Sequence, residues 1–184
     1  RLRDNDKESV SIDVEKFHAP DAQILIVDDV EMNLIVACSL LKRIEIQVDT
    51  AQSGEAAVEK AKEKQYDIIF LDSMMPGMNG EETMHAIRKQ CELNVETPII
   101  VLTAHAVKGA REEYLSLGYT NYLSKPIDGN KLEAMIQSYL PDEKIIFDFE
   151  KKDDDRKDSE SSAGENGSVL KQISEIEGID AVKG

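Results

Sequence analysis

The chain has 184 residues, and its 37 acidic residues outnumber its 22 basic ones to give a formal net charge of −15. Nucleic acid and anionic membrane surfaces are recognised mainly through clustered Lys and Arg, so this charge argues against both as partners. Apolar residues make up 41% of the chain, and no apolar run is long enough to span a bilayer. The N-terminus is charged and lacks the apolar block of a signal peptide, so we expect a cytoplasmic segment without direct membrane contact.

The composition changes along the chain and divides it into four segments. Residues 1–21 are polar with mixed charge and are predicted to be an N-terminal linker, whereas residues 22–141 show the regular periodicity of a folded domain. Residues 142–168 are predicted to be a disordered, mixed-charge linker, although the apolar run Ile145–Phe147 could instead pack on the domain edge. Residues 169–184 regain amphipathic spacing but are too short to bury a core. Because position 1 is not Met, we expect a fragment of a longer protein.

Within the folded segment, short apolar runs alternate with longer segments whose apolar residues recur every three or four positions. The apolar runs predict strands at Gln23–Asp28, Glu45–Asp49, Asp67–Asp72, Pro98–Thr103 and Tyr119–Ser124. The longer segments predict helices at Met32–Arg43, Gly54–Gln65, Glu81–Gln90, Ala106–Leu117 and Asp128–Leu140. Parallel neighbouring strands need crossover connections, so five strand-then-helix units predict a doubly wound α/β domain with a parallel sheet.

Polar residues stand at the ends of four of these strands. If the strand order is 2-1-3-4-5, these four strands are neighbours, and their carboxyl ends meet at one edge of the sheet. Ligands of open α/β sheets bind at that edge. The residues expected to converge there are Asp28, Asp29, Asp72, Thr103 and Lys125.

Three converging carboxylates repel one another unless cations compensate their charge. A divalent ion and the ammonium of Lys125 would balance them, and oxygen-only ligands favour Mg²⁺, with Mn²⁺ as a substitute. A phosphoryl group at this site would meet the metal, Lys125 and the hydroxyl of Thr103. Taken singly, each residue also has an ordinary interpretation as a helix cap, a strand terminator or a solvated side chain. Their joint occurrence at four strand ends favours a site.

The same strand ends carry four motifs of one known family. They read ILIVDD at Ile24–Asp29, FLDSMMPGMNG at Phe70–Gly80, LTA at Leu102–Ala104 and LSKP at Leu123–Pro126. With these motifs, residues 22–141 resemble a receiver domain of the two-component response-regulator family. The resemblance implies a flavodoxin-like fold.

The resemblance also implies a role for each site residue. Asp72 would be the phosphoacceptor, and it would hold Mg²⁺ together with Asp28, Asp29 and the main-chain carbonyl of Met74. The roles of the remaining residues follow in the same way: Thr103 as the switch hydroxyl, Lys125 as the contact to the phosphoryl group, and Tyr122 as the aromatic switch residue. For Tyr122, a half-buried aromatic on an edge strand remains the alternative interpretation.

Two further stretches point to the context of the domain. Residues 30–34 resemble receivers inside hybrid sensor histidine kinases, and residues 173–180 resemble the opening of a histidine-containing phosphotransfer domain. The implied partners are therefore a kinase phosphohistidine domain or a phosphotransfer domain. No basic DNA-recognition element follows residue 141, which favours relay over transcription. The parent would be a hybrid histidine kinase, and this fragment would turn over no substrate beyond its own phosphorylation and dephosphorylation.

Three functions are open to a chain with these residues. A phosphorylatable switch would repack the surface of the fourth helix, fifth strand and fifth helix. A pseudo-receiver would share the fold and only bind partners, but every acid, the Thr and the Lys are retained here. A Mg²⁺-dependent phosphatase with an aspartyl nucleophile is the third. Its class has a second Asp two residues after the nucleophile at the end of the first strand, where this chain reads Asp28-Asp29-Val30.

Overall fold

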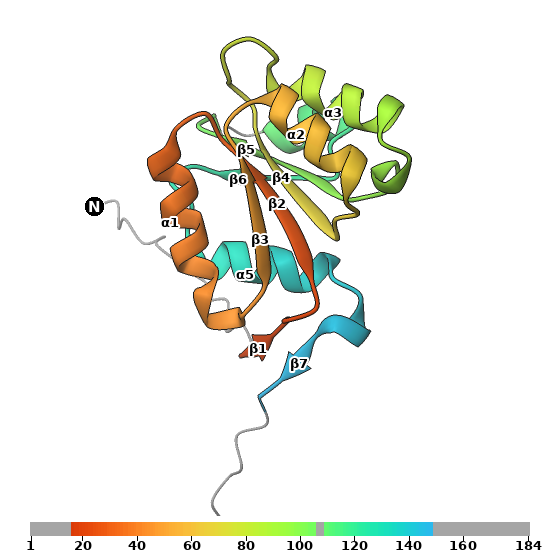
Figure 1. Cartoon of the computed structure of the whole chain (residues 1–184). Helices are drawn as coiled ribbons and strands as arrows, with labels where there is room; N and C mark the ends of the chain where they lie inside the picture. Colours follow the sequence, from red (N-terminus) through yellow and green to blue (C-terminus); the bar gives the residue numbers. More distant parts are fainter. Residues whose placement is uncertain (1–15, 106–108, 149–184) are drawn as a thin grey trace, which may run out of the picture. The chain divides into compact units, whose positions relative to one another are not determined.

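The computed structural model describes residues 16–105 and 109–148. Five strands form one parallel sheet in the order β3-β2-β4-β5-β6 (Figure 1). Their bounds are Gln23–Val27 for β2, Gln47–Ala51 for β3, Ile68–Asp72 for β4, Ile99–Thr103 for β5 and Asn121–Ser124 for β6. The five strands of this sheet can be numbered in chain order, leaving out β1 and β7, which form a separate pair. Their order is then 2-1-3-4-5, which confirms the predicted doubly wound fold.

Helices cover both faces of this sheet, with α1 and α5 on one face and α2 and α3 on the other (Figure 1). Their bounds are Glu31–Leu41 for α1, Gly54–Glu63 for α2, Gly80–Gln90 for α3, Ala110–Leu117 for α4 and Gly129–Tyr139 for α5. Side-chain caps fix three of the helix starts, because Ser53, Asn79 and Asp128 each accept a hydrogen bond from a main-chain N–H three residues later. Three short 3₁₀ helices, η1 to η3, lie at Lys42–Ile44, Glu92–Asn94 and Asp142–Lys144.

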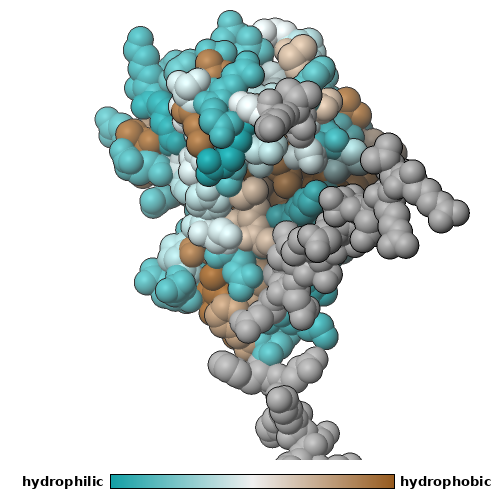
Figure 2. Space-filling view, turned by 180° about the vertical axis from the view of Figure 1, so that it is seen from behind, coloured by the Kyte–Doolittle hydropathy of each residue, from teal (hydrophilic) through white to brown (hydrophobic). Residues whose placement is uncertain are grey.

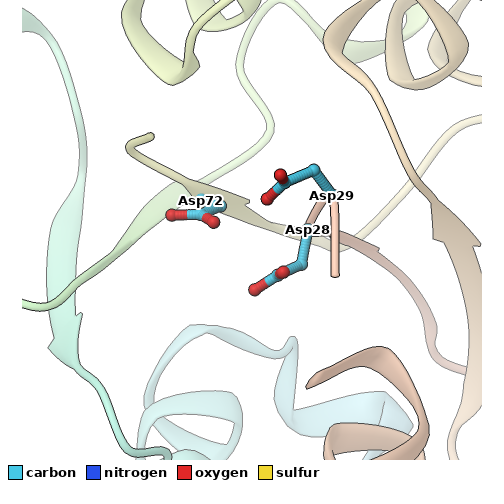
Figure 3. Close-up of side chains that lie close together, drawn as sticks. All are labelled: Asp28, Asp29 and Asp72. Carbon is cyan, nitrogen blue, oxygen red and sulfur yellow. The ribbon is translucent and has the colours of Figure 1, made fainter. Parts of the chain in front are cut away.

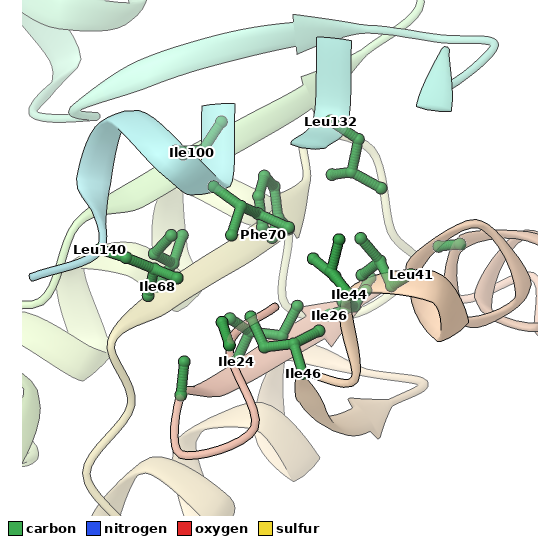
Figure 4. Close-up of a cluster of buried hydrophobic side chains, with 14 of the residues drawn as sticks. Ile24, Ile26, Leu41, Ile44, Ile46, Ile68, Phe70, Ile100, Leu132 and Leu140 are labelled. Atoms are coloured by element: carbon green, nitrogen blue, oxygen red, sulfur yellow. The ribbon is translucent and has the colours of Figure 1, made fainter. Parts of the chain in front are cut away.

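The strands divide the core into two clusters, because successive side chains of a strand point to opposite faces of the sheet. Ile24 and Ile26 of β2 pack with α1 and α5, in the cluster that Figure 4 shows. Leu25 and Val27 pack with α2 and α3 on the other face. All five residues of β4 and all five of β5 are buried, as expected for strands covered on both sides. The strands that end at the site are therefore held in place by side chains packed on both faces of the sheet.

Two element boundaries differ from the sequence-based prediction for a local backbone reason. The second strand of the sheet runs from Gln47 to Ala51 rather than from Glu45, because Glu45 takes a left-handed conformation (φ 56°) that ends η1. The fourth helix begins at Ala110 rather than at Ala106. Gly109 has φ 96°, which no helical residue adopts, so a continuous helix from Ala106 is excluded.

Two short strands lie outside the predicted limits of the domain. β1 (Phe17–His18) pairs antiparallel with β7 (Ile146–Phe147), and Phe17 is fully buried. Residues 17–21 and 142–148 were predicted to belong to linkers, with packing of Ile145–Phe147 on the domain edge as the alternative. The structure shows that alternative, and it adds Phe17 and β1 to the folded unit. The apolar Phe17 and Ile145 pack into the core cluster of α1 and α5, so these segments belong to the folded unit. Residues 1–15 and 149–168, and the phosphotransfer-like segment 169–184, lie outside the described residues.

The surface is mostly hydrophilic on the face that Figure 2 shows, with separate hydrophobic patches. Within the described residues, no helix has both the length and the apolar composition needed to cross a membrane.

Candidate functional site

Three carboxylates gather at the carboxyl ends of β2 and β4. Asp72 is the last residue of β4, and Asp28 and Asp29 follow β2 directly. One carboxylate oxygen of each residue lies within 4.8 Å of the others, and Figure 3 shows the three side chains around a common space. Asp28 and Asp72 are 1% and 5% exposed, whereas Asp29 is more accessible to solvent. The pairing of β2 with β4 causes this convergence, because it aligns the two strand ends.

Lys125 supplies the positive charge of this cluster. Its Nζ lies 2.6 Å from Oδ2 of Asp28 and 2.8 Å from Oδ2 of Asp72. The residue follows β6, and its main-chain N–H donates to the carbonyl of Thr103 at 2.7 Å, which extends the pairing of β5 with β6 to the site. Burial alone would lower the pKa of Lys125, but the hydrogen bonds to Asp28 and Asp72 outweigh it and the pKa is raised. Lys125 is therefore protonated at neutral pH and supplies one positive charge to the cluster.

Main-chain and side-chain donors orient two of the carboxylates. Asn33 donates to both oxygens of Asp28, at 2.9 and 3.1 Å, and the main-chain N–H of Val30 donates to Oδ1 at 2.9 Å. Oδ1 of Asp72 accepts a hydrogen bond from the main-chain N–H of Met74 at 3.1 Å. The sequence reasoning missed Asn33. Its position in the first turn of α1, five residues after Asp28, was the available signal.

The two switch candidates, Thr103 and Tyr122, both contact Tyr114 of α4. Oγ1 of Thr103 lies 2.7 Å from the hydroxyl of Tyr114 and accepts the main-chain N–H of His105 at 3.0 Å. Among residues 16–105 and 109–148, the hydroxyl of Thr103 makes no hydrogen bond to Asp72. Tyr122 is partly buried and stacks on Tyr114, with ring centroids 6.1 Å apart and an interplanar angle of 27°. Tyr114 was also missed, because it is distant from Thr103 in sequence and belongs to no local motif.

The donor set fits a hard divalent cation. Every side-chain ligand atom in the cluster is a carboxylate oxygen, the donor that Mg²⁺ prefers, and no His or Cys belongs to it. Met74 stands two residues after Asp72, so its main-chain carbonyl comes from the loop that follows β4. Asp72 is also a carboxylate held between a lysine and two acids, and an ionised carboxylate needs no general base to act as a nucleophile.

Comparison with known proteins identifies the family of this domain. A family model of the response regulator receiver domain matches residues 24–137. The chain belongs to this family. The receiver is 35% identical over 129 residues to the aerobic respiration control sensor protein ArcB of Escherichia coli (strain K12), and 36% identical over 118 residues to the signal transduction histidine-protein kinase BarA of the same strain. These matches cover 70% and 64% of this chain but only 16% and 13% of ArcB and BarA.

Solved structures of receivers agree with the fold. The receiver domain of sensor histidine kinase PA1611 from Pseudomonas aeruginosa PAO1 is 34% identical with a TM-score of 0.58, over 64% of this chain and 96% of that one. That structure has a magnesium ion coordinated in its active-site cleft. The receiver of Ssk1 in complex with the histidine phosphotransfer protein Ypd1 of Saccharomyces cerevisiae is 28% identical with a TM-score of 0.59, over 64% of this chain and 88% of that one.

Proposed function

We propose that this receiver accepts a phosphoryl group on Asp72 from a phosphohistidine, with Mg²⁺, as one step of a phosphorelay in a hybrid sensor histidine kinase. The observation that carries this proposal is the arrangement of Asp72 with Asp28 and Asp29, bridged by Lys125. Its relatives ArcB and BarA are sensor kinases of much greater length, which supports the same context. The proposed location is the cytoplasm, including the cytoplasmic part of a membrane-anchored kinase.

Asp28, Asp29, Asp72 and the main-chain carbonyl of Met74 would hold the Mg²⁺ ion, with Mn²⁺ as a substitute. When bound, this ion supplies positive charge for the phosphoryl oxygens. A carboxylate oxygen of Asp72 attacks the phosphorus, and the bond between phosphorus and the histidine nitrogen breaks. The electron pair of that bond stays on the imidazole, and the product is an acyl phosphate. Lys125 remains protonated and pairs with a phosphoryl oxygen, while its hydrogen bond to Asp28 keeps the ammonium in place.

The charge placed on Asp72 would draw the hydroxyl of Thr103 toward the phosphoryl group and shift the packing of α4, β6 and α5. Tyr122 would take part, because it lies on β6 and stacks on α4 through Tyr114. A groove of about 450 Å³ lies between these elements and is lined by Arg111, Tyr122 and Lys131 among others. This groove is the surface whose shape a shift of α4 would change.

The donor domain would dock on α1, next to the acidic cluster. Val30, Met32, Ile35 and Val36 are 47%, 63%, 51% and 46% exposed, so an apolar surface borders the loop that holds Asp28 and Asp29. Exposed apolar surface of this kind marks a protein contact. The proposed partner is a kinase phosphohistidine domain or a phosphotransfer domain. The complex of the Ssk1 receiver with Ypd1 shows that a related receiver binds a partner of the second kind.

Phosphorylation by a small-molecule donor tests the central step. We expect the full chain, incubated with Mg²⁺ and phosphoramidate, to gain one acid-stable, base-labile phosphoryl group in intact mass spectra. Asp72→Asn should gain none, because the amide is not a nucleophile for phosphorus. Asp21→Asn is the matched control, because Asp21 is exposed and lies outside the site, and it should label like the unaltered chain. Equal labelling of Asp72→Asn would remove the assignment. An unlabelled parent chain would favour the binding-only pseudo-receiver instead.

A further inference from the structure

The hydroxyl of Thr103 already has two hydrogen-bond partners. Its Oγ1 accepts the main-chain N–H of His105 and lies 2.7 Å from the hydroxyl of Tyr114 on α4. A threonine hydroxyl has one proton and two acceptor lone pairs, so these two bonds fix the direction in which Oγ1 lies. The short distance between the two hydroxyl oxygens is typical of a well-formed bond.

A phosphoryl group on Asp72 needs the same hydroxyl. For Thr103 to donate to a phosphoryl oxygen, its Oγ1 must come within about 3 Å of that oxygen. In the structure, the part of the chain that is described shows no hydrogen bond from Oγ1 to Asp72 or to Lys125. The hydroxyl of Thr103 has one proton, so it cannot donate to the Tyr114 oxygen and to a phosphoryl oxygen at the same time. The two acceptors compete for that proton.

The ring of Tyr114 connects this hydrogen bond to the neighbouring elements. It stacks on Tyr122 of β6 and makes an edge contact with Tyr119, with centroids 6.0 Å apart at 82°. Aromatic pairs of this geometry contribute to packing independently of the hydroxyl. Removing only the oxygen of Tyr114 therefore separates the hydrogen bond to Thr103 from the packing of the rings.

We propose that the Tyr114 hydroxyl is a positioning group that holds Thr103 in its resting place and thereby limits how readily Asp72 takes a phosphoryl group. This inference rests on the proposed phosphorylation of Asp72. Tyr114 acts only through Thr103 and touches none of the three carboxylates. Its loss should favour the state in which Thr103 faces Asp72 and should leave the affinity for Mg²⁺ alone unchanged.

The test is calorimetric titration of the full chain with beryllofluoride, an analogue of the phosphoryl group, in the presence of Mg²⁺. We expect Tyr114→Phe to bind it roughly two- to tenfold more tightly, the effect of losing one competing hydrogen bond. In a Thr103→Val background the same substitution should change nothing, because the hydroxyl that Tyr114 restrains is absent. Tyr66→Phe is the matched control, because it removes a tyrosine hydroxyl that is bonded to Asp49 outside the site.

Three results would overturn the inference while the proposed function stands: equal binding by Tyr114→Phe, weaker binding by it, or an equal gain in the Thr103→Val background. Thermal unfolding of each variant separates these results from a loss of folding. If the unaltered chain does not bind beryllofluoride in the presence of Mg²⁺ at any concentration, the proposed function fails, and the inference fails with it.

Discussion

At the scale of single residues, Lys125 supplies the positive charge of the site. Its ammonium lies 2.6 to 2.8 Å from two carboxylates, and it competes with a cation for the same oxygens. We expect Lys125→Gln to bind Mg²⁺ about tenfold more tightly, because the positive charge that repels the ion is gone. Phosphorylation of Asp72 should nevertheless slow, because the phosphoryl oxygens lose their ammonium partner. Lys89→Gln, on the exposed surface of α3, is the control. A variant with weaker Mg²⁺ binding would contradict this account of the charge.

Lys125 should also make the free energy of unfolding depend on pH in the alkaline range. The pKa of Lys125 is raised above its ordinary value of 10.5 in the folded chain. Its contribution to the free energy of unfolding is therefore fully present below 10.5 and is lost as the pH rises through the raised folded value. In urea titrations, the stability difference between the parent and Lys125→Gln should stay constant from about pH 7 to 10 and shrink above that range. A difference that grows at alkaline pH would show that the sign is wrong.

Sequence alone predicted the acidic residues and Lys125, because each stands at the end of a strand and the strand order brings these ends together. It did not predict the two residues that hydrogen-bond Asp28 and Thr103. Asn33 reaches Asp28 from α1, and Tyr114 reaches Thr103 from α4, so both contacts depend on how a helix packs beside a strand. Such packing has no fixed spacing in the sequence.

At the scale of elements, the exposed apolar surface of α1 predicts where the donor domain binds. Ile35→Lys places a charge in this surface, so transfer from a phosphohistidine-bearing domain should fall about tenfold or more, as for a central interface residue. Phosphorylation by phosphoramidate should be unchanged, since Ile35 is exposed on α1 and is not one of the site residues. The control is Leu93→Lys on η2, which is exposed to a similar extent (48%) but lies on another element. If both variants slow transfer equally, α1 is not the docking surface.

The type of every element in the five strand-then-helix units was predictable, but most boundaries differ by one or two residues, and the start of the fourth helix differs by four. Apolar periodicity locates the buried face of a helix, and it does not record where the backbone changes conformation. Glu45 and Gly109 both adopt positive φ, and the next element begins two residues later than predicted after Glu45 and four residues later at Gly109. Glycine at position 109 is a recognisable turn signal, whereas a left-handed glutamate at position 45 has no such signal.

At the scale of the whole domain, the pairing of β1 with β7 makes residues outside 22–141 part of the folded unit. Phe17 is fully buried against the α1 and α5 cluster. We expect Phe17→Ala to lower the free energy of unfolding by about 3 to 5 kcal/mol, the usual cost of removing a buried Phe. Ile146→Ala, in the partner strand but 54% exposed, should cost much less. Equal losses in urea unfolding would mean that the pairing of the strands, and not the burial of Phe17, stabilises this end.

The strand pair escaped prediction because each strand has only two residues and the partners are far apart in the sequence. The five-stranded sheet was predictable because its strands are long enough to show a pattern and alternate regularly with helices along the chain. Contacts between the two ends of the domain become visible only in the folded structure.

The central claim is that Asp72, and no other carboxylate, carries the phosphoryl group. The most direct measurement is reduction of the phosphorylated chain with borohydride, which converts an aspartyl phosphate to homoserine, followed by mass spectrometry of its peptides. The account predicts homoserine at position 72 only, and only when Mg²⁺ was present during phosphorylation. Homoserine at Asp28 or Asp29, or labelling that is independent of Mg²⁺, would contradict it.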